Sequence, residues 1–162
     1  MKNEEIIIIN FQKFPIQKVM KIISKPCNSN EFSVILIVLY LKGILNNYNV
    51  VGLLAGEFIL LLLKIYFARD RPFRNNDKIN KYTDSSYDNP YLNMYSFPSG
   101  HSFISVLLSM ILLEKCPDNS LLKLFPILVA LSRIHLGVHY PTDVIFGYIF
   151  GKMFYYLFIA EA

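Results

Sequence analysis

Long apolar runs with almost no charge constrain the fold of this chain more than any other feature. The segments 50–63 and 144–160 each contain a single charged residue. Over the 162 residues, 54% are hydrophobic and 17% are charged, and the mean hydropathy is +0.38. In soluble domains about a quarter of the residues are charged. The sequence therefore predicts an all-α, membrane-embedded helical bundle, with a soluble all-helical core as the alternative.

The bundle is expected to contain about five apolar helices and an amphipathic N-terminal helix. Apolar segments of helical length are found at 32–45, 50–69, 99–114, 121–135 and 141–160. A bilayer-spanning helix needs about 20 residues, with roughly 17 as the lower limit, so the second and fifth segments qualify and the others are marginal. We expect a single domain over 1–162, in which 1–31 lies at the membrane surface and contains a lysine-bearing helix at about 11–24.

Charge, cysteines and the N-terminus exclude several other classes. The net charge of +4 has no arginine-rich arm beside it, so nucleic-acid binding is not expected. Cys27 and Cys116 form no CxxC pattern, which indicates reduced, structural thiols. The apolar run 6–9 is too short for a signal peptide, and acidic residues precede it.

The first group of candidate functional residues follows the second apolar segment. Lys64 and Arg71-Pro72 supply two cations, which would share one face of a continuing helix about 10 Å apart. Arginine offers a planar fork to phosphate oxygens and lysine a point charge. The alternative is that both side chains anchor a helix end at the membrane surface. After Pro72, the polar segment 73–97 is predicted to be a long active-site loop.

The second group is Ser96-Phe97-Pro98-Ser99-Gly100-His101, which has the pattern of a helix start. Unpaired backbone N–H groups at such a start bind anions, and Gly100 allows the backbone to approach a phosphate closely. His101 then lies in the first turn, where it can donate a proton. The alternative is an ordinary helix cap with an incidental histidine.

The third group has the most specific spacing. His139 and Asp143 are four residues apart at a helix start that Pro141 favours. Asp143 can hold one imidazole nitrogen and leave the other as a nucleophile. Arg133, at the end of the preceding helix, would bind the transferring phosphoryl group.

The rival interpretation of the third group is a metal site. His135, His139 and Asp143 have four-residue spacing, but Gly137 and Pro141 argue against one continuous helix. No HExxH motif or acidic cluster accompanies them. We therefore predict no metal and assign His135 either to packing or to support of the neighbouring site residues.

All three groups are expected to meet on one membrane face. If successive apolar helices cross alternately, the ends of 50–69 and 121–135 and the starts of 99–114 and 141–160 fall on the same side. Glu57, midway along 50–69, is expected to pair with a polar group inside the bundle.

Together these residues resemble the three-part motif of the type 2 phosphatidic acid phosphatase superfamily, Lys-x6-Arg-Pro, Pro-Ser-Gly-His and Ser-Arg-x5-His-x3-Asp. The chain matches it without a departure in Lys64-x6-Arg71-Pro72, Pro98-Ser99-Gly100-His101 and Ser132-Arg133-x5-His139-x3-Asp143. A looser likeness, around 95–101 and 143–155, is to the compact polyisoprenoid diphosphate phosphatases of this superfamily. The resemblance implies an integral-membrane, multi-pass phosphatase that acts on a lipid phosphate or diphosphate without a cofactor.

The resemblance also implies roles for single residues. His139 would attack phosphorus to form a phosphohistidine, Asp143 would orient it, and His101 would protonate the leaving group. The phosphoryl oxygens would be held by Lys64, Arg71, Arg133 and the Ser99-Gly100 segment. Two alternatives remain: a vanadate-binding haloperoxidase-type enzyme, and a non-catalytic membrane protein that binds lipid headgroups.

Overall fold

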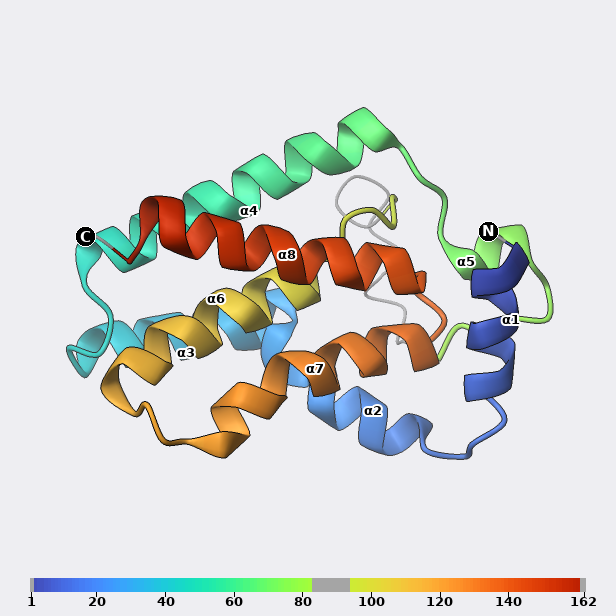
Figure 1. Cartoon of the computed structure of the whole chain (residues 1–162), viewed down its shortest axis with the longest axis horizontal. Helices are drawn as coiled ribbons and strands as arrows, with labels where there is room; N and C mark the ends of the chain where they lie inside the picture. Colours follow the sequence, from blue (N-terminus) through green and yellow to red (C-terminus); the bar gives the residue numbers. More distant parts are fainter. Residues whose placement is uncertain (1, 83–93, 161–162) are drawn as a thin grey trace.

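A computed structural model describes residues 2–82 and 94–160, and within these ranges the regular structure is helical (Figure 1). The N-terminal part comprises α1 (Lys2–Phe11), α2 (Gln17–Ser24), the short 3-10 helix η1 (Lys25–Cys27) and α3 (Ser29–Leu41). It is followed by α4 (Asn47–Phe67), α5 (Pro72–Asn75), α6 (Gly100–Lys115), α7 (Ser120–His135) and α8 (Pro141–Phe158). The five predicted apolar segments correspond to α3, α4, α6, α7 and α8.

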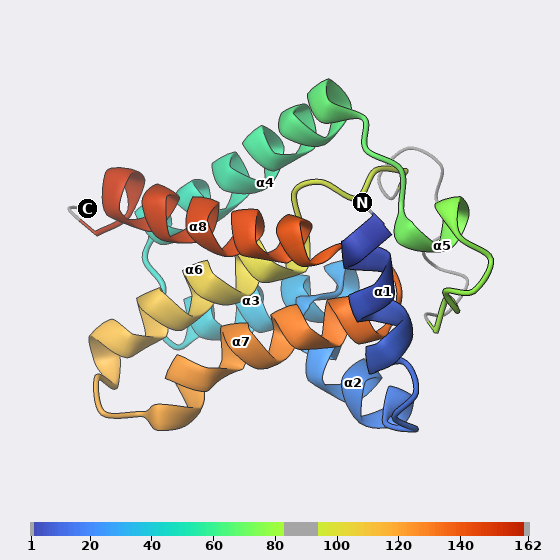
Figure 2. The same cartoon turned by 45° about the vertical axis from the view of Figure 1, so that its right-hand side comes forward.

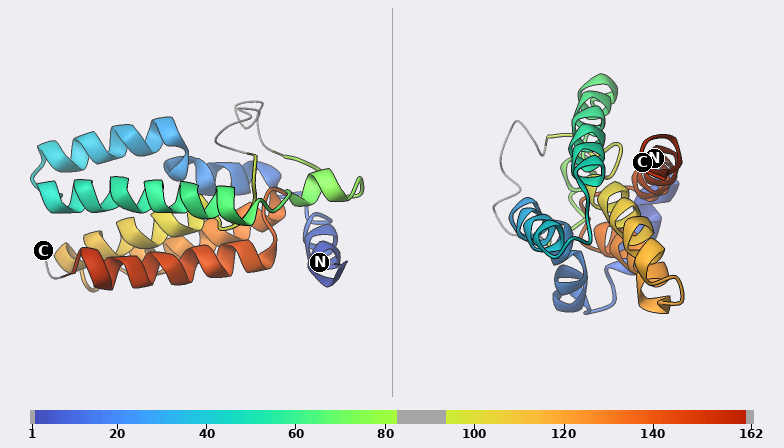
Figure 3. Two further views of the ribbon diagram at one scale, coloured as in Figure 1. Left: turned by 90° about the horizontal axis from the view of Figure 1, so that it is seen from above. Right: turned by 90° about the vertical axis from the view of Figure 1, so that its left-hand side faces the viewer.

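Helix α6 lies in the middle of the bundle, with α4, α7 and α8 around it (Figure 3). Its apolar side chains are buried along nearly the whole length of the helix. Leu107 and Ile111 are fully buried, and Phe103 makes an edge-to-face contact with Phe154 of α8 at a ring-centroid distance of 5.7 Å. The first turn of α6 is therefore fixed by the core rather than by a surface loop.

Two glycines bring α8 unusually close to α6. A Cβ at Gly147 would lie 2.5 Å from the carbonyl oxygen of Ser99, and one at Gly151 would lie 2.9 Å from that of Phe103. Small residues four apart on a helix allow this close approach of backbones. The packing sets the start of α8 directly against the start of α6.

The outward faces of the helices are apolar. In α4, exposed residues such as Leu54, Phe58 and Leu62 follow one another along the helix. Within the described ranges, α4 is the one helix whose stretch is long and apolar enough to cross a membrane by length and composition.

The structure corrects the expectation for Glu57. Its side chain lies on the exposed face of α4 and, within the described residues, makes no hydrogen bond or ion pair. The neighbouring positions Gly56 and Leu60 face the core instead. The reason is helical periodicity: the side of α4 that packs against α6 carries small and aliphatic residues, and Glu57 lies off that side.

Two predicted boundaries were also wrong. The single helix expected at 11–24 is interrupted after Phe11, the last residue of α1, and the separate helix α2 begins at Gln17, because a helix continued past Phe11 would place the ring of Pro15 against the carbonyl of Phe11. The second of them, α2, packs against α7. Helix α4 begins at Asn47 and not at residue 50, because Asn46 and Asn49 each accept a hydrogen bond from the backbone N–H of the other in a capping box.

The close contact between α6 and α8 predicts the effect of Gly147→Ala. Alanine normally favours a helix over glycine by about 1 kcal/mol. Here the new methyl group would press on the Ser99 carbonyl, so we expect a net loss of about 1–3 kcal/mol. Thermal unfolding in detergent measures it. Gly52→Ala is the matched control, because a Cβ there would meet side-chain carbons of Ile159, the nearest at 3.0 Å, and no backbone carbonyl. Equal melting temperatures for the two variants would contradict the account.

Candidate active site

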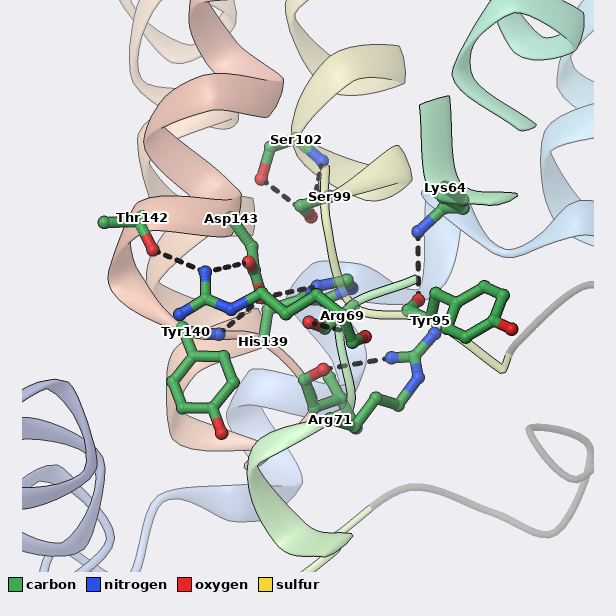
Figure 4. A network of polar contacts seen from close by, with 12 residues as sticks. Lys64, Arg69, Arg71, Tyr95, Ser99, Ser102, His139, Tyr140, Thr142 and Asp143 are labelled. Carbon is green, nitrogen blue, oxygen red and sulfur yellow. Dashed lines mark hydrogen bonds and ion pairs between the residues drawn. The ribbon is translucent and has the colours of Figure 1, made fainter. Parts of the chain in front are cut away.

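Four helix ends converge at one end of the bundle (Figures 1 and 2). They are the C-terminal ends of α4 and α7 and the N-terminal ends of α6 and α8. The connections 68–71 and 136–140 run across this end of the bundle. Residues from each of the three sequence motifs are thus brought into one region (Figure 4): Lys64, Arg71, Ser99, His139 and Asp143.

The segment that carries the first two cations is not one helix, which corrects the expectation of a shared helical face. Helix α4 ends at Phe67, and Ala68 adopts a left-handed conformation with φ of 45°. Arg71 is extended, as the proline that follows favours. Lys64 donates from Nζ to the carbonyl of Tyr95 at 3.2 Å, and Arg71 donates from Nη1 to the carbonyl of Val138 at 3.0 Å. Both cations are therefore held by backbone carbonyls.

The region 73–97 was predicted to be a long loop, and its first residues form the short helix α5 instead. Residues 83–93 lie outside the described part of the chain. Ser96 ties the end of this region to the segment after α4. Its N–H donates to the carbonyl of Arg69 at 2.7 Å, and its hydroxyl donates to the carbonyl of Asp70 at 3.0 Å. The first and second motifs are thereby fixed to each other.

Ser99 is the N-cap of α6, as its sequence context predicts. Its Oγ accepts a hydrogen bond from the Ser102 N–H at 3.4 Å and lies 3.1 Å from the Ser102 hydroxyl. Gly100 is the first residue of the helix, so the positive end of the α6 dipole lies at the site. His101 follows in the first turn, and its Nε2 is 3.1 Å from Oδ1 of Asn28. Asn28, which precedes α3, has no signal in the motif and was missed.

His139 and Asp143 are adjacent and buried, with side chains 3% and 0% exposed. Nδ1 of His139 lies 3.5 Å from Oδ2 of Asp143, and that oxygen accepts a hydrogen bond from the Tyr140 N–H at 2.8 Å. The carbonyl of Asp143 accepts from the N–H of Ser99 at 3.0 Å, which joins the second motif to the third. The carboxylate faces Nδ1, so Nε2 is the ring nitrogen left for chemistry.

Arg69 lies in this site, and the sequence reasoning missed it. Its Nη1 donates to Oδ1 of Asp143 at 2.6 Å and to the hydroxyl of Thr142 at 2.7 Å. Its guanidinium carbon lies 4.1 Å from the ring centroid of Tyr140. Arg69 stands two residues before Arg71, at a position that the Lys-x6-Arg-Pro motif leaves unspecified.

The electrostatic field of the site keeps His139 neutral. Burial of the ring and the positive charges of Arg71, Lys64 and Arg133 lower the pKa of His139 well below its ordinary value, and the hydrogen bond that the ring donates to the Ser96 backbone opposes this shift. Arg133 itself is 1% exposed. A neutral imidazole surrounded by three cations suits attack on an anionic phosphate.

His135 has a different environment from His139. Its Nε2 lies 3.0 Å from the carbonyl of Phe14, and its ring packs edge-on against Phe11. His135 therefore holds the N-terminal region against α7, in agreement with the packing role assigned to it.

A model of the PAP2 superfamily matches residues 45–160. The chain belongs to the PAP2 superfamily. The undecaprenyl-diphosphatase of Sulfolobus acidocaldarius is 31% identical over 110 residues, which cover 67% of this chain and 48% of that protein. The chain spans about half the length of the curated relatives it matches.

Solved PAP2 structures share the fold. A transmembrane PAP2-type phosphatidylglycerolphosphate phosphatase of Bacillus subtilis aligns with a TM-score of 0.73 and 24% identity, over 96% of this chain and 82% of that chain. The LpxE protein of Aquifex aeolicus aligns with a TM-score of 0.74 and 20% identity, over 91% of this chain and 89% of that chain. The predicted superfamily and the all-helical fold class are confirmed, and the transmembrane character of the first of these two proteins agrees with the predicted integral-membrane location.

The lowered pKa of His139 predicts how stability depends on pH. Below about pH 6.5 the histidine of the unfolded chain takes up a proton while the folded site resists it, so stability falls with acidification. His139→Gln lacks this linkage. Between pH 6.5 and 5 its free energy of unfolding should therefore fall by up to about 2 kcal/mol less than that of the wild-type protein. Thermal unfolding of both proteins at the two pH values measures the difference. An identical acid dependence would contradict the lowered pKa.

Proposed function

We propose that this PAP2-superfamily chain is a lipid phosphatase that hydrolyses a phosphate or diphosphate monoester through a phosphohistidine at His139, without a metal. The observation that supports this most strongly is the buried, neutral His139 beside Asp143 and under the charges of Lys64, Arg71 and Arg133. A nucleophile, an orienting carboxylate and three cations are the groups that phosphoryl transfer requires.

The first half of the reaction forms the phosphoenzyme. Nε2 of His139 attacks phosphorus as the bond to the leaving oxygen breaks. Burial and the nearby cations lower the pKa of His101, so His101 takes up its proton together with the phosphate anion, which offsets those positive charges. It then gives this proton to the leaving oxygen, so the lipid leaves as a neutral alcohol, or as a lipid phosphate when the substrate is a diphosphate. Asp143 stabilises the positive charge that develops on the His139 ring.

The second half returns the enzyme to its starting state. Water attacks the phosphorus of phosphohistidine, and His101, now neutral, takes a proton from that water. The bond from phosphorus to Nε2 breaks, and inorganic phosphate leaves. In both halves charge develops on the phosphoryl oxygens, which the three cations and the N-terminal end of α6 stabilise.

The substrate class follows from where the site lies. It is at the end of a bundle whose outward faces are apolar, so a lipid can keep its chain in the bilayer while its headgroup enters the site. The names of the relatives, an undecaprenyl-diphosphatase and a phosphatidylglycerolphosphate phosphatase, are consistent with this class. The experiment below separates diphosphates of polyprenols from glycerolipid phosphates.

Phosphate release from a lipid panel tests the proposal. The purified protein is assayed in detergent, with EDTA present, on phosphatidic acid, phosphatidylglycerol phosphate, farnesyl and longer polyprenyl diphosphates, and glucose phosphate. We expect EDTA-resistant release from at least one lipid and much slower release from the sugar. His139→Ala should abolish release, and His101→Ala should lower it by about 10²–10⁴-fold.

His135→Ala is the matched control, because it removes a histidine whose ring lies away from His139. It is expected to lower stability but to retain release in the fraction that stays folded. No release from any lipid by folded wild-type protein would overturn the proposal. Bromide oxidation with vanadate and peroxide would then favour the haloperoxidase-type alternative, and lipid binding alone would favour the non-catalytic one.

A further inference from the structure

We infer that Glu4 and Arg69 form a positioning pair, in which Glu4 of α1 fixes Arg69 and Arg69 fixes Asp143 against the nucleophile. The inference rests on the proposed function, and neither residue belongs to the three sequence motifs. It makes α1 a component of the catalytic end of the bundle.

Arg69 is held in one orientation from several sides. Nη1 bonds Asp143 and Thr142, Nη2 bonds Oε2 of Glu4 at 2.9 Å, and the guanidinium lies over the ring of Tyr140. A planar guanidinium with both terminal nitrogens engaged has little freedom to rotate. Arg69 directs its charge to carboxylates, whereas Lys64 and Arg71 donate to the backbone carbonyls described above (Figure 4).

The contact with Asp143 determines which way that carboxylate faces. Arg69 donates a hydrogen bond to Oδ1, and the Tyr140 N–H donates one to Oδ2, the oxygen nearest Nδ1 of His139. Without the bond to Oδ1, the carboxylate can rotate about its Cβ–Cγ bond, a torsion with a broad minimum. The alignment with His139 would then no longer be fixed.

Glu4 closes the network from the other side. Oε1 accepts hydrogen bonds from the Thr142 N–H at 3.0 Å and from the Thr142 hydroxyl at 2.7 Å, while Oε2 accepts from Arg69. Burial acts to raise the pKa of Glu4, but the Thr142 hydrogen bonds and the Arg69 charge outweigh it and the pKa is lowered. The ionised carboxylate therefore bridges Arg69 to the first turn of α8.

Helix α1 is well placed for this role. It lies across the end of the bundle where the four helix ends converge (Figure 2). Ile8 is fully buried in a cluster with Ile134, Tyr140 and Val144. Apolar packing thus anchors the helix, and Glu4, one turn before Ile8, points its carboxylate into the polar network.

Steady-state kinetics with matched variants test the pair. Glu4→Gln keeps an oxygen for Thr142 but loses the charge that holds Arg69, and Arg69→Gln removes the cation. We expect kcat to fall by about 10–100-fold with KM nearly unchanged, because the groups that would hold phosphate are untouched. Since Glu4 acts through Arg69, the double variant should be no slower than Arg69→Gln alone. Arg69→Lys should restore part of the loss.

Glu5→Gln is the control for charge loss on α1, because Glu5 accepts a hydrogen bond from Asn76 and takes no part in the network. It should leave kcat unchanged. An equal loss of kcat in Glu5→Gln, or additive losses in the double variant, would reduce the network to a structural role. A raised KM with unchanged kcat in Arg69→Gln would show that Arg69 binds substrate.

A second readout does not depend on turnover. In protein labelled with ¹⁵N-histidine, the His139 resonances are assigned by their loss in His139→Ala. Arg69→Gln should shift these resonances and leave those of His101 and His135 in place, while Glu5→Gln should shift none. If the His139 resonances do not move in Arg69→Gln, the inference is overturned, whether or not the wild-type protein releases phosphate. A lack of phosphate release overturns the proposed function and is a separate result.

Discussion

The buried carboxylate of Asp143 is the point on which the structure of the catalytic end depends. An ionised carboxylate without solvent is strongly unfavourable unless charges and hydrogen bonds compensate it. Here the compensation comes from Arg69, after α4, and from the Tyr140 N–H, before α8. The carbonyl of the same residue accepts from the Ser99 N–H at the start of α6. Three segments distant in sequence are therefore joined at one residue. The contacts that hold this end of the bundle together are the same contacts that form the site.

The same arrangement orients the positive charges of the site. Backbone carbonyls hold Lys64 and Arg71, and these partners come from the segment before α6 and the segment before α8. The cations are thus oriented before a phosphate arrives, which is the condition under which electrostatic stabilisation is most effective in catalysis. Their field also lowers the pKa of His139, so the charges expected to attract the substrate also keep the proposed nucleophile unprotonated.

Sequence spacing predicted the helical segments and predicted that the eight site candidates would lie at one end of the bundle. Both could be predicted because apolar periodicity and motif spacing are local properties. What it missed depends on distant contacts or on local backbone conformation. The left-handed Ala68 ends α4 early, and nothing in the residue type alanine indicates such a conformation. The partners Arg69, Asn28 and Glu4 become visible only when separate segments meet. Glu57 was placed on the wrong face because the segment is apolar on all sides and its sequence does not say which side packs.

The central claim is that His139 becomes covalently phosphorylated during turnover, and the phosphoenzyme itself tests it most directly. Folded protein that is releasing phosphate from its lipid substrate is quenched within milliseconds under alkaline conditions, where phosphohistidine survives, and then digested and mapped by mass spectrometry. The account predicts a phosphate on the peptide that carries His139, labile to acid and absent without substrate. Rapid turnover with no phosphate on His139 at any quench time, or with phosphate on His101 instead, would contradict it.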